Sequence, residues 1–288
     1  MIFAMKIPTT LICLPVLALG STLLAQNPEQ KPVKQETKAE QKAAQQTAEQ
    51  KAPKDSKVTM ADPAITAIDD FIKKSEIDKT KRSWKQTLKA PPKVAFSAAH
   101  DYFWHIETEV GQLTIRYFTD TAPIHVASGI YLPRLGYYDG LNFHRIIPGF
   151  MAQGGCPTGS GTGNPGFFMD GEFEGGRSHD KAGILSMANT GRPRSDGAQF
   201  FITFGPTKGL DGRHTVWGEL VEGTKALQAL EKRGTRLNDG VLGRKGPKIV
   251  RTWVSVAPKK KAEMKGEDMK DADAKKAAEQ QEGGEHKG

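Results

Sequence analysis

Between residues 102 and 256, apolar side chains recur in short runs separated by glycines, and this pattern limits the possible folds more than any other feature. Runs of four to eight residues in which apolar and polar side chains alternate are typical of β-strands. Only 123–135, with Pro123 in its first turn and Gly136 after its end, and 223–232 have the features of helices. The pattern therefore predicts a mainly β domain and not a series of βαβ repeats.

The predicted strands can be placed from these runs and from the turn residues between them. Gly111 separates the first two runs and indicates a hairpin, and Thr121 is expected to cap the helix at 123–135. The predicted strands are 103–110, 112–118, 143–147, 150–153, 184–187, 199–204, 215–220 and 248–256.

The segments that flank this domain differ from it in composition. Residues 26–58 and 258–288 are rich in Lys, Gln, Glu and Ala, so we interpret them as a disordered linker and a disordered charged tail. Residues 59–92 read as a short helical extension, in which Asp62-Pro63 starts a helix and Ile65, Ile68 and Ile72 share one face. A second amphipathic piece is expected through Ile77, Trp84 and Leu88. The folded domain is then predicted to span residues 93–257.

The N-terminus has the features of an export signal. Lys6 precedes an apolar run at 7–24, and Ala25 provides a small residue before polar Gln26, so residues 1–25 are predicted to be a signal peptide. Cleavage after Gly20 fits equally well. The run is also long enough to remain as an uncleaved membrane anchor. We expect an exported protein, periplasmic or secreted, that is membrane-anchored only if the segment is retained.

Charge and cysteine content argue against a nucleic-acid-binding protein and against a fold held by disulfides. The net charge is +8, but no segment is a basic block of the kind that binds nucleic acid. After removal of the signal, Cys156 is the single cysteine, so no internal disulfide is expected and this thiol reads as a partly buried small apolar residue. A monomer is the default expectation.

Four stretches carry the chemical information. They are Phe143-His144-Arg145-Ile146-Ile147-Pro148-Gly149-Phe150-Met151-Ala152-Gln153-Gly154-Gly155, Ser186-Met187-Ala188-Asn189, Ala198-Gln199-Phe200-Phe201-Ile202 and Leu210-Asp211-Gly212-Arg213-His214. In this order and spacing they resemble the cyclophilin family of peptidyl-prolyl cis–trans isomerases over about Phe103 to Val256. The resemblance implies a closed eight-stranded antiparallel β-barrel capped by two α-helices, with the site on the outer barrel face. It also implies that proline-containing polypeptide segments are the partners.

The resemblance also implies a role for each matching residue. Arg145 corresponds to the catalytic arginine, and Gln153 to the glutamine beside it. The pocket for the proline ring corresponds to Phe150, Met151, Phe201, Leu210 and His214. The groove for the residues before the proline corresponds to Gln199, Ala188 and Asn189.

Elementary chemistry supports a role for Arg145 in such a reaction. Resonance holds an X–Pro amide planar behind a barrier of about 18–20 kcal/mol. In the twisted transition state the prolyl nitrogen regains a lone pair, and a guanidinium can donate a hydrogen bond to it. An apolar pocket beside the arginine would fix the ring and exclude water. The reaction needs no metal and no cofactor, and because no proton moves, His214 is expected to be a pocket wall and not a proton shuttle.

Three other patterns have simpler interpretations. Residues 161–166 fit the dinucleotide pattern G-x-G-x-x-G, but Pro165 interrupts them and no helix is expected to follow, so we interpret them as a long surface loop. His100 and His105 have no further ligand at metal spacing, so no metal site is predicted. His144 is expected to be an exposed strand residue.

One departure from the family pattern concerns inhibitor binding. Many cyclophilins have a tryptophan immediately before the leucine that corresponds to Leu210, and here that residue is Gly209. The tryptophan aids binding of cyclosporin, so its absence predicts weak inhibition while leaving isomerisation intact. Cys156 and the loop that follows it also differ from the eukaryotic pattern and look more like bacterial members.

Three functions remain open at this stage. The first is an isomerase that assists folding of exported proteins. The second is a binding module that holds proline-containing segments without catalysis, and the presence of Arg145, Gln153 and Phe201 favours the enzyme over it. The third is an anchored scaffold in which the helical extension and the charged tails carry the function.

Overall fold

The computed structural model describes residues 62–235 and 246–259. The predicted signal peptide, the predicted linker at 26–58 and nearly all of the predicted tail lie outside these residues. The described residues form one eight-stranded antiparallel sheet in the order β3-β4-β6-β5-β7-β2-β1-β8. The strands are β1 (His100–Thr108), β2 (Gly111–Tyr117), β3 (Arg145–Ile147), β4 (Met151–Gly154), β5 (Ile184–Met187), β6 (Phe200–Thr203), β7 (Val216–Glu222) and β8 (Ile249–Pro258).

The sheet curls so that the residues just before its two end strands, β3 and β8, meet. Asn142 forms an isolated antiparallel bridge with Lys248, and the N–H of Phe143 donates to the carbonyl of Pro247 at 3.0 Å. The prediction of a mainly β fold with eight antiparallel strands is confirmed. The closure consists of this short bridge and not of a full ladder between the two end strands.

The core is built from side chains that alternate along the strands. In β1, Tyr102, Trp104 and Ile106 are fully buried while the residues between them are partly exposed, as expected for a strand with one face on the core. The Trp104 ring lies 4.9 Å from the Phe200 ring and 5.9 Å from the Trp217 ring, measured between centroids. Contacts of large aromatic rings across several strands fix the sheet in one packing.

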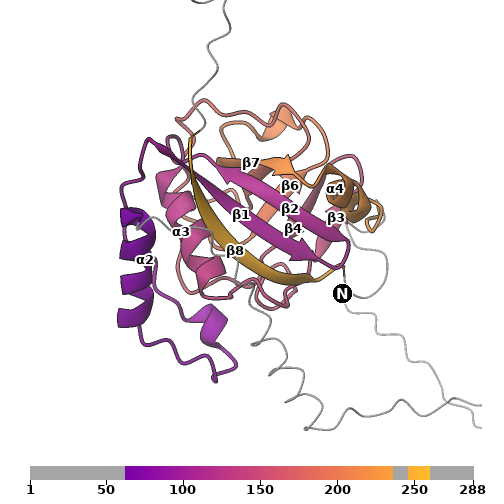
Figure 1. Cartoon of the computed structure of the whole chain (residues 1–288). Coiled ribbons are helices and arrows are strands. Elements are labelled where there is room, and N and C mark those ends of the chain that lie inside the picture. The colour runs from indigo at the N-terminus through magenta and orange to yellow at the C-terminus, as the bar shows by residue number, and fades with distance from the viewer. Residues whose placement is uncertain (1–61, 236–245, 260–288) are drawn as a thin grey trace, which may run out of the picture. The chain divides into compact units, whose positions relative to one another are not determined.

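Two helices cover the sheet, as predicted, and Figure 1 shows them on opposite sides of the strands. They are α3 (Pro123–Arg134), which packs against β8, and α4 (Thr224–Glu231), which packs against β2, β3 and β4. Gly136 follows α3 with φ +68°, a backbone conformation that glycine adopts without steric cost.

The predicted cap of α3 is wrong. The Thr121 hydroxyl is buried and has no hydrogen-bond partner among the described residues, and the N-cap residue Ala122 offers no side-chain acceptor. The Glu172 carboxylate, far along the chain, instead accepts the N–H groups of Ile124 at 3.1 Å and of His125 at 3.0 Å. A tertiary carboxylate therefore replaces the local cap, and its charge is favourable at a helix N-terminus.

The N-terminal extension packs onto the barrel. Helix α2 (Pro63–Lys74) begins at Asp62, whose carboxylate accepts the N–H of Ala64 at 3.0 Å as predicted, and also the Tyr102 hydroxyl of β1 at 2.6 Å. It packs on α3, and Ile68 is fully buried in the same core as the strands. The extension and the barrel thus share one core.

The second amphipathic piece of the extension is reduced to a single 3₁₀ turn, η1 (Trp84–Gln86). Leu88 is buried, but its N–H donates to the carbonyl of Pro165 at 2.9 Å and not to a helical neighbour. The expectation of a longer helix here was therefore wrong, because a contact with a distant loop takes the hydrogen bond that a helix would need.

Candidate active site

A local turn sets the register of the first two predicted site residues. Pro148-Gly149 joins β3 to β4, Gly149 has φ +75°, and the N–H of Phe150 donates to the carbonyl of Ile147 at 3.0 Å. Proline followed by glycine suits such a turn, because proline presets φ and glycine tolerates positive φ. The resulting hairpin pairs Arg145 directly with Gln153.

The sheet extends this pair into a row. Gln153 on β4 is opposite Phe201 on β6, which is opposite Ser186 on β5. Residues opposite one another in neighbouring strands present their side chains to the same face. The predicted residues Arg145, Gln153 and Phe201 therefore lie side by side on the face away from the fully buried side chains of Ile146 and Ile202.

A chain of amide hydrogen bonds orients Gln153 toward the arginine. An Nη1 hydrogen of Arg145 points at Gln153 Oε1 over 3.5 Å, the outer limit for a hydrogen bond. Gln153 Nε2 donates to Gln199 Oε1 at 3.0 Å, and Gln199 Nε2 donates to the carbonyls of Gly161 at 2.8 Å and Gly163 at 2.9 Å. Because the two carbonyls can only accept, they fix the Gln199 amide with its oxygen toward Gln153, and this in turn fixes the Gln153 amide with its oxygen toward Arg145.

Of the residues predicted for the proline pocket, Phe201 belongs to this row and Met151 lies on β4 two residues before Gln153. Met151 and Phe201 are 2% and 4% exposed, while Phe150, Leu210 and His214 are partly exposed. The His214 ring meets the Phe201 ring edge-on at 5.4 Å, and its Nδ1 donates to the carbonyl of Met187 at 2.9 Å. That bond fixes the imidazole as a wall beside Phe201. The predicted roles of these residues stay predictions.

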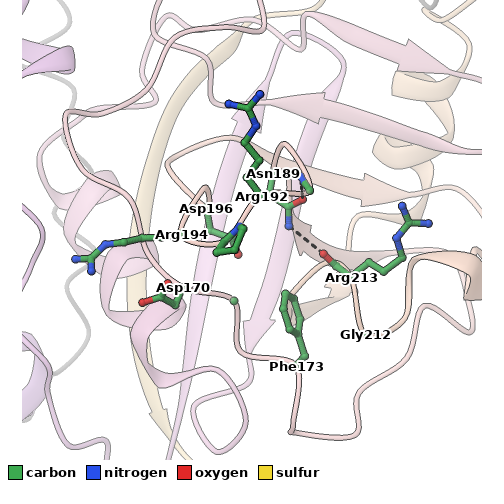
Figure 2. A pocket seen from close by; sticks show the side chains of 11 residues that line it. Asp170, Phe173, Asn189, Arg192, Arg194, Asp196, Gly212 and Arg213 are labelled. Carbon is green, nitrogen blue, oxygen red and sulfur yellow. Dashed lines mark hydrogen bonds between the residues drawn. The ribbon is translucent and has the colours of Figure 1, made fainter.

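The residues predicted to bind the peptide before the proline lie at two strand ends. Ala188 and Asn189 follow β5, and Gln199 precedes β6. The N–H of Ala188 donates to the carbonyl of Gln199 at 2.9 Å, and the side chain of Asn189 donates to the carbonyl of Arg213 at 3.0 Å. Asn189 also lines a cavity of about 480 Å³ (Figure 2).

Sequence reasoning missed a buried Ser–His–Asp arrangement behind Phe201. The His179 ring stacks on the Phe201 ring at 5.9 Å; its Nδ1 lies 2.7 Å from an Asp211 oxygen and its Nε2 lies 2.9 Å from Ser186 Oγ. Ser186 and His179 are 0% exposed, so no substrate carbonyl can reach the hydroxyl as hydrolysis would require. The arrangement supports Phe201 from behind, and no local motif signals it, because its members come from three separate segments.

The titration behaviour of this cluster fits a neutral imidazole beside a carboxylate. Burial lowers the pKa of His179 despite the opposing charge of Asp211. Burial raises the pKa of Asp211, but hydrogen bonds from the His179 N–H, the Ser178 hydroxyl and the His179 ring together outweigh it and hold that pKa at about 2. The carboxylate is therefore ionised and orders the imidazole under the pocket wall at neutral pH.

A second buried network ties together the loops around the site. His125 is 0% exposed, and its ring nitrogens lie 2.7 Å from Glu172 and 2.9 Å from Asp196. Asp196 also accepts the Thr215 hydroxyl at 3.3 Å, immediately before β7. Burial lowers the pKa of His125, but the two carboxylates outweigh burial and raise it above its ordinary value. The imidazolium thus joins α3 to the 172 and 196 segments.

Two expectations about single residues were wrong. His144 is not exposed: both of its ring nitrogens are buried and have no partner among the described residues, and burial followed by the charge of Arg145 lowers its pKa. Cys156 is fully buried but does not behave as an apolar side chain, since its sulfur accepts the N–H groups of Gly161 at 3.2 Å and Gly163 at 3.3 Å. Burial raises the pKa of this thiol, and hydrogen bonds from Thr158 and the two glycines bring it below the ordinary value.

The glycine-rich pattern at 161–166 lies in a long connection between β4 and β5 that contains no helix, as predicted. The carbonyls of Gly161 and Gly163 accept hydrogen bonds from Gln199, and their N–H groups donate to the Cys156 sulfur. Within residues 62–235 and 246–259, no cluster of three or more His, Cys, Asp or Glu has the geometry of a metal site. In the same part of the chain, no helix combines the length and the apolar character needed to cross a bilayer.

Comparison with known proteins points in one direction. Residues 103–253 match the family described as cyclophilin type peptidyl-prolyl cis-trans isomerase/CLD. A protein of Synechococcus elongatus named peptidyl-prolyl cis-trans isomerase is 44% identical over 137 residues, which are 48% of this chain and 90% of that protein. Peptidyl-prolyl cis-trans isomerase-like 2 of Cryptococcus neoformans is 47% identical over 136 residues, 46% of this chain, but the chain spans only 24% of that relative.

Solved structures give the same result for the fold. A crystal structure of a cyclophilin type peptidyl-prolyl cis-trans isomerase from Cryptosporidium parvum has a TM-score of 0.51 at 31% identity. The match covers 55% of this chain and 99% of that one. A second crystal structure of that protein, in the presence of the dipeptide Ala-Pro, has a TM-score of 0.50 and covers 53% of this chain and 98% of that one.

Proposed function

Because the chain belongs to the family of cyclophilin-type peptidyl-prolyl cis–trans isomerases, we propose that it accelerates rotation about X–Pro peptide bonds and thereby assists the folding of exported proteins. The observation that carries the proposal is the row of Arg145, Gln153 and Phe201 across three neighbouring strands, with the His214 ring packed edge-on against Phe201. We propose that this row sets a fixed cation beside an apolar site for a five-membered ring.

The mechanism follows from what changes when the amide twists. The planar ground state has no free lone pair on the prolyl nitrogen, so a donor there gains nothing until conjugation breaks. Arg145 would then donate to that nitrogen and lower the barrier through an interaction absent from the ground state. Met151 and Phe201 would hold the ring while the acyl side rotates, and Gln153, with its oxygen directed at the guanidinium, would keep the donor in place.

The proposed site for the preceding residues uses backbone and amide groups near Gln199, Ala188 and Asn189. Catalysis then requires only binding, orientation and one directed hydrogen bond, with no bond made or broken. The Ala-Pro dipeptide present with the Cryptosporidium relative is the smallest peptide that contains an X–Pro bond, which is the kind of bond we propose that this pocket binds.

The proposal that the substrates are exported proteins rests on the N-terminal sequence. The charged start, the apolar run at 7–24 and Ala25 before Gln26 form the order of an export signal. N-terminal sequencing of the protein purified from its native cell tests this, with a mature start at Gln26 expected, or at Ser21 for the alternative site. Recovery of an intact Met1 in the cytosolic fraction would overturn the export proposal without touching the isomerase proposal.

A cis–trans exchange assay on short X–Pro peptides tests the isomerase proposal itself. Uncatalysed exchange takes about 10–100 s at 25 °C, so catalysis is measurable by NMR exchange spectroscopy or by a coupled protease assay. We expect a rate that rises linearly with the concentration of protein. Binding of the peptides without any acceleration would favour a proline-binding module and would refute the enzyme.

Gly209 leads to a prediction about inhibition. This residue is exposed in the 3₁₀ turn η2 (Lys208–Leu210), and a Cβ placed on it meets nothing within 4 Å. We expect weak cyclosporin inhibition of the wild type, and inhibition at least about tenfold stronger for Gly209→Trp, because an indole would add apolar contact area at the rim of the pocket. Inhibition constants from the exchange assay measure this effect.

Gly209→Ala is the matched control, since it adds the Cβ without the ring. Cyclosporin should inhibit this variant as weakly as it inhibits the wild type. Inhibition of the wild type at nanomolar cyclosporin would contradict the prediction.

A further inference from the structure

The cavity lined by Asn189 adjoins the groove proposed for the residues before the proline, because Asn189 is also one of the residues of that groove. Three segments enclose it: the loop at 189–196, the segment at 170–173 and the turn at 212–213 (Figure 2). Asn189 belongs to both regions and is tied to the opposite wall by its hydrogen bond to the carbonyl of Arg213. A chain that passes Ala188 and Asn189 would therefore meet this cavity next.

The cavity carries a surplus of positive charge. Arg192, Arg194 and Arg213 line it, all three are exposed, and within residues 62–235 and 246–259 none of them forms an ion pair with a carboxylate. Asp170 is the single exposed carboxylate among the lining residues. Asp196 also lines the cavity, but it is 2% exposed and its carboxylate is directed at His125, 2.9 Å away.

The loop that presents two of these arginines is held by its own hydrogen bonds. The N–H of Gly191 donates to Asn189 Oδ1 at 3.0 Å, and Ser195 Oγ donates to the carbonyl of Arg192 at 2.7 Å. Arg194 adopts φ +50°, a left-handed conformation that few residues other than glycine occupy. These bonds hold the backbone of the loop, while the guanidinium groups point in different directions around the rim in Figure 2.

An apolar side chain projects into the same space. Phe173 is 44% exposed although it is a large aromatic residue, and it lines the cavity together with Asn189 and the 212–213 turn (Figure 2). An apolar surface surrounded by cations suits a side chain with methylene groups and a terminal carboxylate. It disfavours lysine and arginine, because like charges would be brought together over a poorly solvated wall.

We propose that this cavity is a charge-selective subsite that binds acidic side chains of the polypeptide on the N-terminal side of the X–Pro bond. The inference rests on the proposed isomerase function and adds its preferred substrate class, proline segments preceded by Glu or Asp. The three guanidinium groups attract the carboxylates, and Phe173 contacts the methylene groups.

The test uses peptides whose only charge is the residue under study. Acetylated and amidated X–Pro peptides would carry Glu, Gln or Lys at the second, third or fourth position before the proline. For the best position we expect kcat/KM to be about five- to tenfold higher for Glu than for Gln, and lower again for Lys, as several exposed charges acting together would give. Raising the salt from about 0.05 M to about 0.5 M should reduce this ratio, because screening weakens interactions between exposed charges.

Two variants with the same change in net charge separate the local subsite from a general electrostatic effect. Arg192→Gln/Arg194→Gln/Arg213→Gln should bring the Glu-to-Gln ratio to about one. Lys74→Gln/Arg82→Gln/Lys93→Gln, which removes two exposed cations from the extension and a third immediately after it, should retain the wild-type ratio. An equal loss in both variants, or no preference in the wild type, would refute the subsite.

Calorimetric affinities for the Glu and Gln peptides keep the inference testable by itself. Turnover of the Gln peptide reports on the proposed isomerase function, whereas the difference in affinity between the two peptides reports on the subsite. Tighter binding of the Glu peptide that disappears in the triple arginine variant supports the inference even if turnover fails. Equal affinities refute it even if turnover succeeds.

Discussion

Replacing Arg145 by alanine should lower kcat/KM for a neutral X–Pro peptide by on the order of a hundredfold or more, equivalent to about 2.7 kcal/mol or more of lost transition-state stabilisation. The expectation follows from the proposed mechanism, in which the guanidinium acts only after the amide has twisted. Peptide affinity should change little by comparison, since the ground state offers the arginine no lone pair on nitrogen. NMR exchange spectroscopy measures both quantities in one sample.

Two further variants test whether the loss of activity depends on the donors and the position of Arg145. Arg145→Lys keeps the charge but loses the fixed fork of donors, so we expect a partial loss of about tenfold. Arg116→Ala removes a partly exposed arginine that pairs with Glu219 on another part of the sheet, and should leave kcat/KM unchanged. Because the Arg145 side chain is only partly buried, circular dichroism and the melting temperature should stay close to wild type. A rate equal to wild type for Arg145→Ala would refute the proposed role.

The largest expected loss of stability is that of His125→Ala, at about 3–5 kcal/mol. The substitution leaves Glu172 and Asp196 facing each other without the cation between them and opens a cavity at a site that is 0% exposed. It also loosens the N-terminus of α3, since the Glu172 carboxylate accepts two backbone N–H groups there. Urea unfolding followed by tryptophan fluorescence measures the change in free energy.

His105→Ala is the matched control for His125. It removes the same side chain from a partly exposed strand position, where the ring stacks on Trp253. We expect a cost of about 1 kcal/mol, which is ordinary for a surface-side substitution. Equal costs for the two variants would contradict the view that His125 is a buried imidazolium on which the loops depend.

The network of His125, Glu172 and Asp196 predicts how the stability of the fold depends on pH. The folded-state pKa of His125 is raised, so its contribution to stability is complete below the unfolded pKa of about 6.5 and is lost as the pH rises through the folded pKa. Burial raises the pKa of Glu172, but bonds from His125 and Ile124 outweigh burial and lower it. Its contribution is therefore complete above an unfolded pKa of about 4.3 and is lost as the pH falls through the folded pKa.

A single substitution tests this assignment. Both ring nitrogens of His125 face carboxylates, and a neutral imidazole has only one N–H to donate. Asp196→Asn supplies an amide donor to Nε2, so a neutral His125 can keep both bonds, and the variant should lose much less stability than the wild type above about pH 6.5. Since burial also lowers the pKa values of His105 and His179, the difference between variant and wild type is the quantity to compare. Parallel pH profiles would contradict the prediction.

Local sequence was sufficient for the elements and for part of the site. Alternating apolar residues predicted all eight strands, and Pro148-Gly149 fixed a hairpin whose register sets Arg145 against Gln153. These features depend on backbone preferences that act over a few residues, and a single chain segment contains all the information they need. Recognition of the motif then supplied the candidate residues, from Arg145 to His214.

Tertiary structure decided what holds those residues in place. The hydrogen bonds from Gln199 to Gly161 and Gly163, the His179 support behind Phe201 and the Glu172 cap on α3 all join segments that only the sheet order brings together. A polar side chain has the same appearance in a sequence whether it is solvated, buried in a network or buried without a partner, which is why Thr121 and His144 were misassigned. Its partners become fixed only when the strands, in an order different from that of the chain, close around them.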